Sequence, residues 1–127
     1  MEHPDVFEPD DPIVQRVREI CLRFPEAVEL PSWGRPSFRV GKIFAVVGQS
    51  SELPHTLVFK SDPEERRALI EDARFFIPPY AGASGWLAIG IDPPETDWVE
   101  LAELVETSYR QVALKRQVAL LGERPSR

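Results

Sequence analysis

The first third of the chain places apolar residues at helical spacing. Asp11-Pro12 is typical of an N-cap followed by a proline in the first turn. Apolar residues then recur at every third or fourth position as far as Phe24. Because a proline disfavours helical backbone in the residue before it, Pro25 ends the pattern. The spacing predicts an amphipathic helix over residues 12–24 with one buried stripe.

The next segment changes from helical spacing to the two-residue alternation of strands. Residues 37–40 alternate polar and apolar positions, and 43–47 form an apolar run rich in β-branched residues. Gly41-Lys42 between them suits a tight turn. Residues 55–60 alternate again. Three strands in succession with short links predict an antiparallel meander.

Two further helices and a fourth strand complete the pattern. Asp62 predicts a helix start with Glu65 closing a capping box, and this helix extends to about residue 73. Residues 86–91 alternate as a strand, and 97–120 carry the apolar spacing of a long last helix. The order α-β-β-β-α-β-α predicts an α+β fold, with an antiparallel sheet of about four or more strands. The N- and C-terminal helices pack on one sheet face and leave the other partly exposed.

A length of 127 residues corresponds to one domain. Residues 1–11 are acidic, contain two prolines and have little apolar content, so we predict a flexible acidic tail. Residues 12–121 form the single predicted domain, and 122–127 a basic tail.

The composition offers little for catalysis. One cysteine and two histidines provide neither a disulfide nor the usual zinc or iron ligands, and no Gly-rich phosphate loop or nucleophile elbow is present. Cys21 lies on the predicted buried stripe, where a thiol is inert. We therefore expect a non-enzymatic protein with no catalytic residues, no metal and no cofactor. The chain has no apolar run of roughly 20 residues and its N-terminus is unlike a signal peptide, so we expect no membrane association and a cytoplasmic location.

The formal net charge is −6, which excludes long-range attraction to nucleic acid as a source of affinity. Any DNA binding must come from a local basic patch. Residues 31–51 contain no acid, and residues 107–127 contain five basic residues against one glutamate. The candidate phosphate contacts are Arg35, Arg39, Lys42, Lys60, Lys115 and Arg116. Their alternative interpretation is ordinary surface charge, and for the last two, complementation of a helix dipole.

Three aromatic residues form a second candidate surface. Trp33 and Tyr80 stand in Pro/Gly-rich segments, and alternation places Trp86 on the outer sheet face. These rings could stack bases beside basic side chains. They could instead line a groove for a small ligand or a protein partner, or seal a small second core.

Short motifs in these segments resemble the MmcQ/YjbR family over roughly residues 12–117. The matching segments are Phe24-Pro25-Glu26-Ala27, Trp33-Gly34-Arg35-Pro36-Ser37-Phe38-Arg39-Val40, Lys42-Ile43-Phe44-Ala45, Asp62-Pro63-Glu64-Glu65-Arg66, Pro78-Pro79-Tyr80 before Gly85-Trp86, Asp97-Trp98 with Leu101, and Ser108-Tyr109-Arg110 with Lys115-Arg116. The resemblance implies a CyaY-like (frataxin-like) α+β fold. It also implies a small DNA-binding protein without catalytic residues. The sequence thus supports DNA binding through the basic hairpin and sheet face, with an aromatic interaction module as the alternative.

Overall fold

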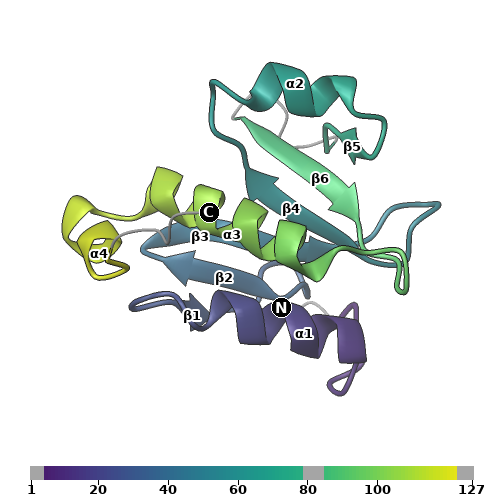
Figure 1. Ribbon diagram of the computed structural model, residues 1–127. Helices are drawn as coiled ribbons and strands as arrows, with labels where there is room; N and C mark the ends of the chain where they lie inside the picture. Colours follow the sequence, from purple (N-terminus) through teal and green to yellow (C-terminus); the bar gives the residue numbers. More distant parts are fainter. Residues whose placement is uncertain (1–4, 79–84, 123–127) are drawn as a thin grey trace.

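A computed structural model describes residues 5–78 and 85–122 as an antiparallel sheet with helices packed on it (Figure 1). The strands follow one another across the sheet as β1-β2-β3-β4-β6-β5. The elements in chain order are α1 (Pro12–Cys21), β1 (Val28–Glu29), β2 (Ser37–Val40), β3 (Lys42–Gly48), β4 (Thr56–Lys60), α2 (Arg66–Glu71), β5 (Phe75–Phe76), β6 (Trp86–Gly90), α3 (Trp98–Val112) and α4 (Lys115–Ala119). The predicted α+β fold with an antiparallel sheet is confirmed.

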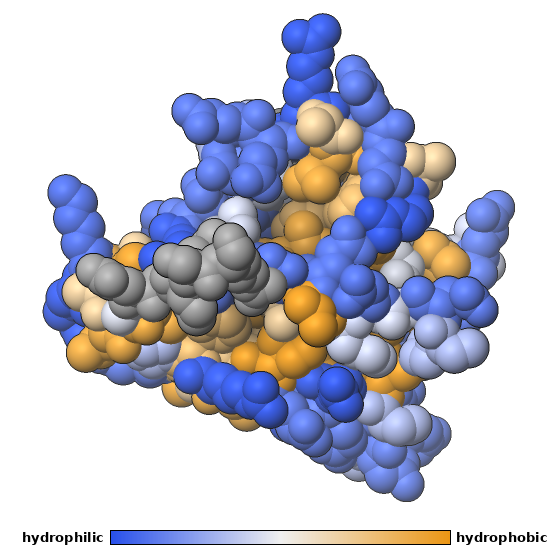
Figure 2. Space-filling model, in the orientation of Figure 1, coloured by the Kyte–Doolittle hydropathy of each residue, from blue (hydrophilic) through white to orange (hydrophobic). Residues whose placement is uncertain are grey.

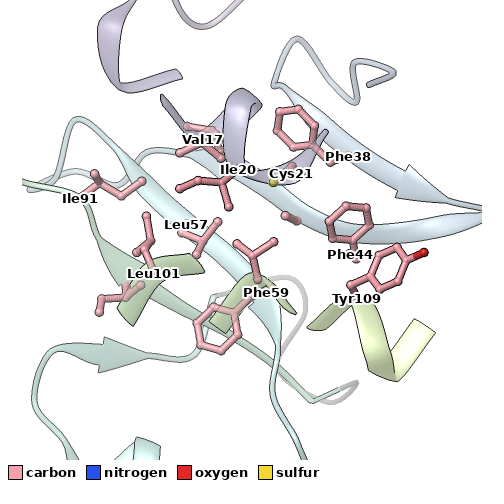
Figure 3. Close-up of a cluster of buried hydrophobic side chains, with 14 of the residues drawn as sticks. Val17, Ile20, Cys21, Phe38, Phe44, Leu57, Phe59, Ile91, Leu101 and Tyr109 are labelled. Atoms are coloured by element: carbon pink, nitrogen blue, oxygen red, sulfur yellow. The ribbon is translucent and has the colours of Figure 1, made fainter. Parts of the chain in front are cut away.

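Helices α1 and α3 lie side by side on one face of the sheet, and the core fills the space between them and the strands (Figures 1 and 3). The strands present their apolar residues to this face in register: Ala45 is opposite Phe59, and Phe59 is opposite Leu87. All three are at most 1% exposed. This burial is the main source of stability, at about 25 cal/mol for each Å² of apolar surface removed from water.

A β-bulge in β3 fixes which residues face away from the helices. Phe38 is opposite Ala45 but Arg39 is opposite Ile43, so Phe44 is the extra residue. Phe44 packs edge-on against Tyr109 of α3, with ring centroids 5.4 Å apart. Because the bulge shifts the alternation by one residue, Ile43 lies beside Arg39 on the face opposite the helices.

Polar contacts fix α3 on the sheet. The Ser108 hydroxyl donates to the carbonyl oxygen of Phe44 at 2.6 Å and accepts from the backbone N–H of Lys60 at 2.8 Å. The Tyr109 hydroxyl donates to the carbonyl oxygen of Pro25 at 2.7 Å. Side chains from one turn of α3 thus provide hydrogen-bond partners for backbone groups of β3, β4 and the loop after α1. Buried polar groups need such partners.

The long last helix predicted over 97–120 is two helices. Ala113 and Leu114 have extended backbone, with ψ of 156° and 155°, so α3 ends and α4 begins there. The Leu114 N–H donates to the Gln117 side chain at 2.8 Å, which caps the new helix. The apolar spacing continues across the break, and for that reason the sequence pattern did not reveal it.

Other boundaries also differ from the prediction. Helix α1 ends at Cys21 rather than at residue 24. The predicted capping box of the second helix is absent: the Asp62 carboxylate accepts the N–H of Glu64 in a turn, and α2 begins only at Arg66, where its N-cap makes no side-chain bond. Strands β1 and β5 were not predicted, since each has two residues and therefore shows no alternation.

The segment before α1 contacts the domain. The Val6 N–H donates to the carbonyl oxygen of Gly34 at 2.9 Å, and the Phe7 ring stacks on His55 at 5.0 Å. His55 Nε2 lies 2.8 Å from a carboxylate oxygen of Asp11, the N-cap of α1. The described residues of the predicted 1–11 tail therefore include a packed segment; residues 1–4 and 123–127 lie outside the described chain.

Candidate functional site

The sheet face turned away from α1 and α3, which we name the outer face, carries the candidate site. Residues directly opposite each other on neighbouring strands point to the same face. Arg39 is opposite Ile43, and Lys60 is opposite Trp86. The β3–β4 pairing ends at Ala45 opposite Phe59, so Ile43 and Lys60 are not directly paired. The two cross-strand pairs lie on the same face, and together we name them the basic row.

The remaining rows of the outer face are uncharged. The second row runs across five strands and the third across three. Their members are Ser37, Val46, Val58, Ala88 and Phe76 in the second row, and Gly48, Thr56 and Gly90 in the third. Ser37, Val58, Ala88 and Thr56 are at most 7% exposed, so the absence of carboxylates from these two rows follows from burial. The partly exposed charges of the outer face are the two cations of the basic row, Arg39 and Lys60.

Arg39 and Lys60 keep their positive charge uncompensated in the described structure. Neither lies within ion-pair distance of a carboxylate of residues 5–78 or 85–122. Arg39 is partly exposed, yet its Nε is buried and has no hydrogen-bond partner. Buried donors without a partner are rare, and an ordered water or anion is a usual explanation. Arg39 is thus suited to accept an anionic ligand.

A third cation approaches the basic row from α2. A Cβ built on Gly85 would lie 3.9 Å from Nη1 of Arg66 and 3.9 Å from Cε of Lys60, so both side chains flank this glycine. Gly85 also has a φ of +84°, which favours glycine. The sequence placed Arg66 in a first helical turn, but no local pattern could show that this turn lies beside Lys60.

The other predicted cations are distributed differently. Lys42 is exposed at the β2–β3 hairpin tip, where it lies opposite the core residue Val40 and so is not part of the outer face. Arg35 lines a separate hollow together with Asp5, Glu8 and Glu29, so it is not part of the basic row. Lys115 and Arg116 belong to α4, which Figure 1 places at the end of the sheet where β2 and β3 are joined.

Arg116 is neutralised by its own partner. Its Nη1 lies 2.7 Å from the Glu26 carboxylate and its Nη2 donates to the other oxygen at 3.1 Å. The hydrogen bond with Arg116 lowers the pKa of the Glu26 carboxyl, and that with Glu26 raises the pKa of Arg116. Arg116 is therefore a poor candidate for a phosphate contact.

The predicted aromatic residues do not share one place in the described structure. Trp86 belongs to the basic row. Trp33 lies in the loop before β2, and the first residue of β2, Ser37, belongs to the second row. Trp33 is 69% exposed and has a φ of +55°, a conformation rare for a non-glycine residue. Tyr80 lies outside the described residues.

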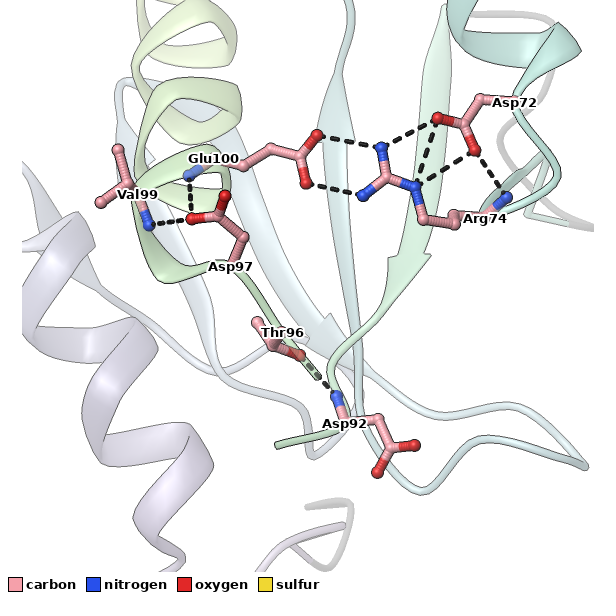
Figure 4. Close-up of polar contacts among 7 residues, drawn as sticks. All are labelled: Asp72, Arg74, Asp92, Thr96, Asp97, Val99 and Glu100. Carbon is pink, nitrogen blue, oxygen red and sulfur yellow. Dashed lines mark hydrogen bonds and ion pairs between the residues drawn. The ribbon is translucent and has the colours of Figure 1, made fainter. Parts of the chain in front are cut away.

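Acidic residues gather in a hollow of about 560 Å³ near the start of α3, which Phe76 and Gly90 of the second and third rows also line. Its lining includes Arg74 and the acids Glu52, Asp92, Glu95, Asp97 and Glu100. Figure 4 shows the Arg74 guanidinium held by both Asp72 and Glu100, with its shortest contact to each at 2.8 Å. These hydrogen bonds, first that with Asp72, raise the pKa of Arg74. Because Arg74, the one cation among the described lining residues, is paired, the hollow repels anions.

A third hollow, of about 550 Å³, lies between α1 and α3. Figure 2, which views the molecule from the helix side, shows apolar side chains between charged ones along this boundary. Trp98 in its lining is covered by the Arg16 guanidinium, 5.2 Å from the ring centroid. Both signs of charge line this groove, so it has no preference for a polyanion.

The described residues show no arrangement for metal chemistry and no membrane helix. In residues 5–78 and 85–122, no group of three or more His, Cys, Asp or Glu side chains could hold a metal ion. Within the same ranges, no helix has the length and apolar character that a bilayer span requires. Cys21 is fully buried, and burial raises the pKa of its thiol, as expected for a structural cysteine.

The fold and the outer face define a small α+β protein with two long helices on one sheet face and the partly exposed cations Arg39 and Lys60 on the other. The family model described as YjbR matches residues 22–111, and the chain therefore belongs to the YjbR family. The fold is similar to the crystal structure of Deinococcus radiodurans protein DR2400, which contains the domain DUF419: the TM-score is 0.69 and the identity 22%, over 90% of this chain and 91% of that one. None of the curated proteins compared with the chain matches it significantly.

Proposed function

We propose that the protein binds nucleic acid with low sequence specificity, through phosphate contacts made by the outer face and the β2–β3 hairpin. The observation that supports this is that Arg39 and Lys60 lie on the outer face, partly exposed and without a carboxylate partner, in a chain with a formal net charge of −6. A polyanion is repelled by the average field of the molecule, so a local positive region decides where it binds.

Arg39 and Lys60 can bind phosphate groups in different ways. The guanidinium of Arg39 can hold a phosphate with two parallel hydrogen bonds, and the ammonium of Lys60 acts as a compact charge. Both side chains stand on paired strands, so their backbones are fixed before the ligand arrives. Contacts to phosphate position a nucleic acid but do not read its sequence, which is why we propose low specificity.

The experiment is fluorescence anisotropy with labelled DNA over a series of salt concentrations. If the outer face and the hairpin neutralise about four phosphates, the slope of log K against log salt is roughly −3.6 for duplex DNA and roughly −2.8 for a single strand. Absence of binding at low salt contradicts the proposal.

A matched pair of variants locates the contact. Lys60→Gln removes one charge from the basic row, and we expect the slope to become shallower by roughly 0.7 to 0.9. Arg23→Gln removes the same charge from an exposed position just after α1, on the helix side, and leaves the slope unchanged. Equal effects of the two variants would show that binding depends on net charge alone.

A second candidate function, a protein-interaction module, is favoured by Trp33. An aromatic ring that is 69% exposed on a loop with left-handed backbone has the properties of an interface anchor. Crosslinking and pull-down with the wild type and with Trp33→Ala test it. A partner lost only with Trp33→Ala supports this function, whereas equal recovery by both proteins rejects it.

A further inference from the structure

We propose that the basic row binds single-stranded nucleic acid, with one base stacked on Trp86. This inference rests on the proposed function and specifies its ligand. It starts from the register of the sheet, in which Trp86 lies directly opposite Lys60 on the outer face. The cation and the aromatic ring are therefore nearest neighbours across two strands.

The ring of Trp86 is available for stacking. The side chain is partly exposed, and among the described residues it takes part in none of the ring-stacking or cation–π contacts that occupy Phe7, Phe24 and Trp98. The indole is thus the aromatic surface of the outer face that a ligand can reach beside a cation.

The spacing of the row suits an extended strand of nucleic acid. Neighbouring strands of a sheet lie about 4.8 Å apart, so Trp86 lies one strand spacing from Lys60, and the strand of Arg39 lies two spacings from that of Lys60 on the other side. A single strand that crosses the sheet along this row meets a guanidinium, an ammonium and a ring in that order. Ile43 between the cations adds an apolar contact.

The ring favours a single strand over a duplex. In a duplex, each base is already stacked on its neighbours and paired, so its face cannot reach an indole. In a single strand, bases can turn outward and stack on aromatic side chains at little sequence preference. The phosphate contacts serve both ligands, whereas Trp86 contributes only to the single strand.

The test measures anisotropy with one labelled strand of roughly 15 nucleotides, alone and annealed to its complement. We expect the single strand to bind more tightly, and Trp86→Ala to weaken it by roughly 5- to 150-fold while duplex binding stays unchanged. Trp86→Phe keeps a ring and restores most of the affinity. Val99→Ala, which shortens an exposed side chain on the helix side, is the control.

A fluorescence measurement covers the case in which Trp86→Ala does not fold. In a protein with Trp33→Phe and Trp98→Phe, Trp86 is the remaining tryptophan, and a saturating single strand should quench its emission. The single-strand inference is wrong if that strand causes no quenching. It is also wrong if the duplex binds as tightly as the single strand and both Trp86 variants bind like the wild type. In either case the proposed function stands. If neither ligand binds, the proposed function itself fails.

Discussion

At the scale of single residues, the polar contacts at the start of α1 connect chain segments that are distant in sequence. Burial by itself would raise the pKa of the Asp11 carboxyl, but the hydrogen bonds from His55, Val14 and Ile13 outweigh it, so its pKa lies below the ordinary 3.8. A carboxyl with a lowered folded-state pKa stabilises the protein above its unfolded pKa. The stabilisation is lost as the pH falls through the folded-state value.

Asp11→Asn tests this linkage. The amide can still accept the N–H bonds of the cap but does not titrate, so we expect the variant to lose less stability than the wild type as the pH falls below about 4. Urea unfolding at a series of pH values measures the difference. Parallel pH profiles for the two proteins would contradict the assigned role of Asp11.

Cys21 provides a second test at this scale. Because the thiol is fully buried and its pKa is raised by that burial, we expect no reaction with a thiol reagent in the native protein and full reaction in denaturant. A colorimetric thiol assay at neutral pH measures both. Rapid reaction without denaturant would show that α1 does not stay packed on the sheet.

At the scale of elements, α3 depends on its N-cap and on contacts that local sequence rules do not show. The carboxylate of Asp97 accepts the N–H groups of Val99 and Glu100, as its place in the sequence predicts (Figure 4). The Glu100 side chain, three residues after the cap, bonds to Arg74 and does not form a capping box with Asp97. A charged partner on another element can thus outcompete a local capping contact.

Removing the cap should have a measurable cost. Asp97→Ala leaves two N–H groups of the first turn without a side-chain acceptor, and we expect a loss of about 1 kcal/mol in the free energy of unfolding. Asp97→Asn keeps an acceptor and should cost much less. Chemical denaturation of the three proteins gives the comparison, and equal stability of the alanine and asparagine variants would contradict the capping role.

The elements show where prediction from sequence succeeds and where it stops. Strands β2, β3, β4 and β6 and the long helices were predicted because their apolar spacing extends over several turns or residue pairs. The bulge at Phe44 and the break at Ala113 were not predicted, since both keep the apolar pattern and change only the backbone.

At the scale of the whole molecule, charge is separated between two regions. The hollow near the start of α3 is lined mainly by carboxylates, while the outer face carries Arg39 and Lys60 without any. The sequence singled out both cations because residues 31–51 contain no acid and because Lys60 ends a predicted strand. It could not separate them from Arg35 and Arg116, since the acids near those two arginines come from distant parts of the chain.

The most direct test of the outer face as the binding surface compares two charge reversals with the same net charge. Arg39→Glu places a carboxylate in the basic row, and Arg23→Glu places one just after α1 on the helix side. Thermal melting first establishes that both variants are folded. We then predict that Arg39→Glu abolishes nucleic acid binding in about 50 mM salt, whereas Arg23→Glu binds nearly as well as the wild type. Equal affinities of the two variants would contradict the account.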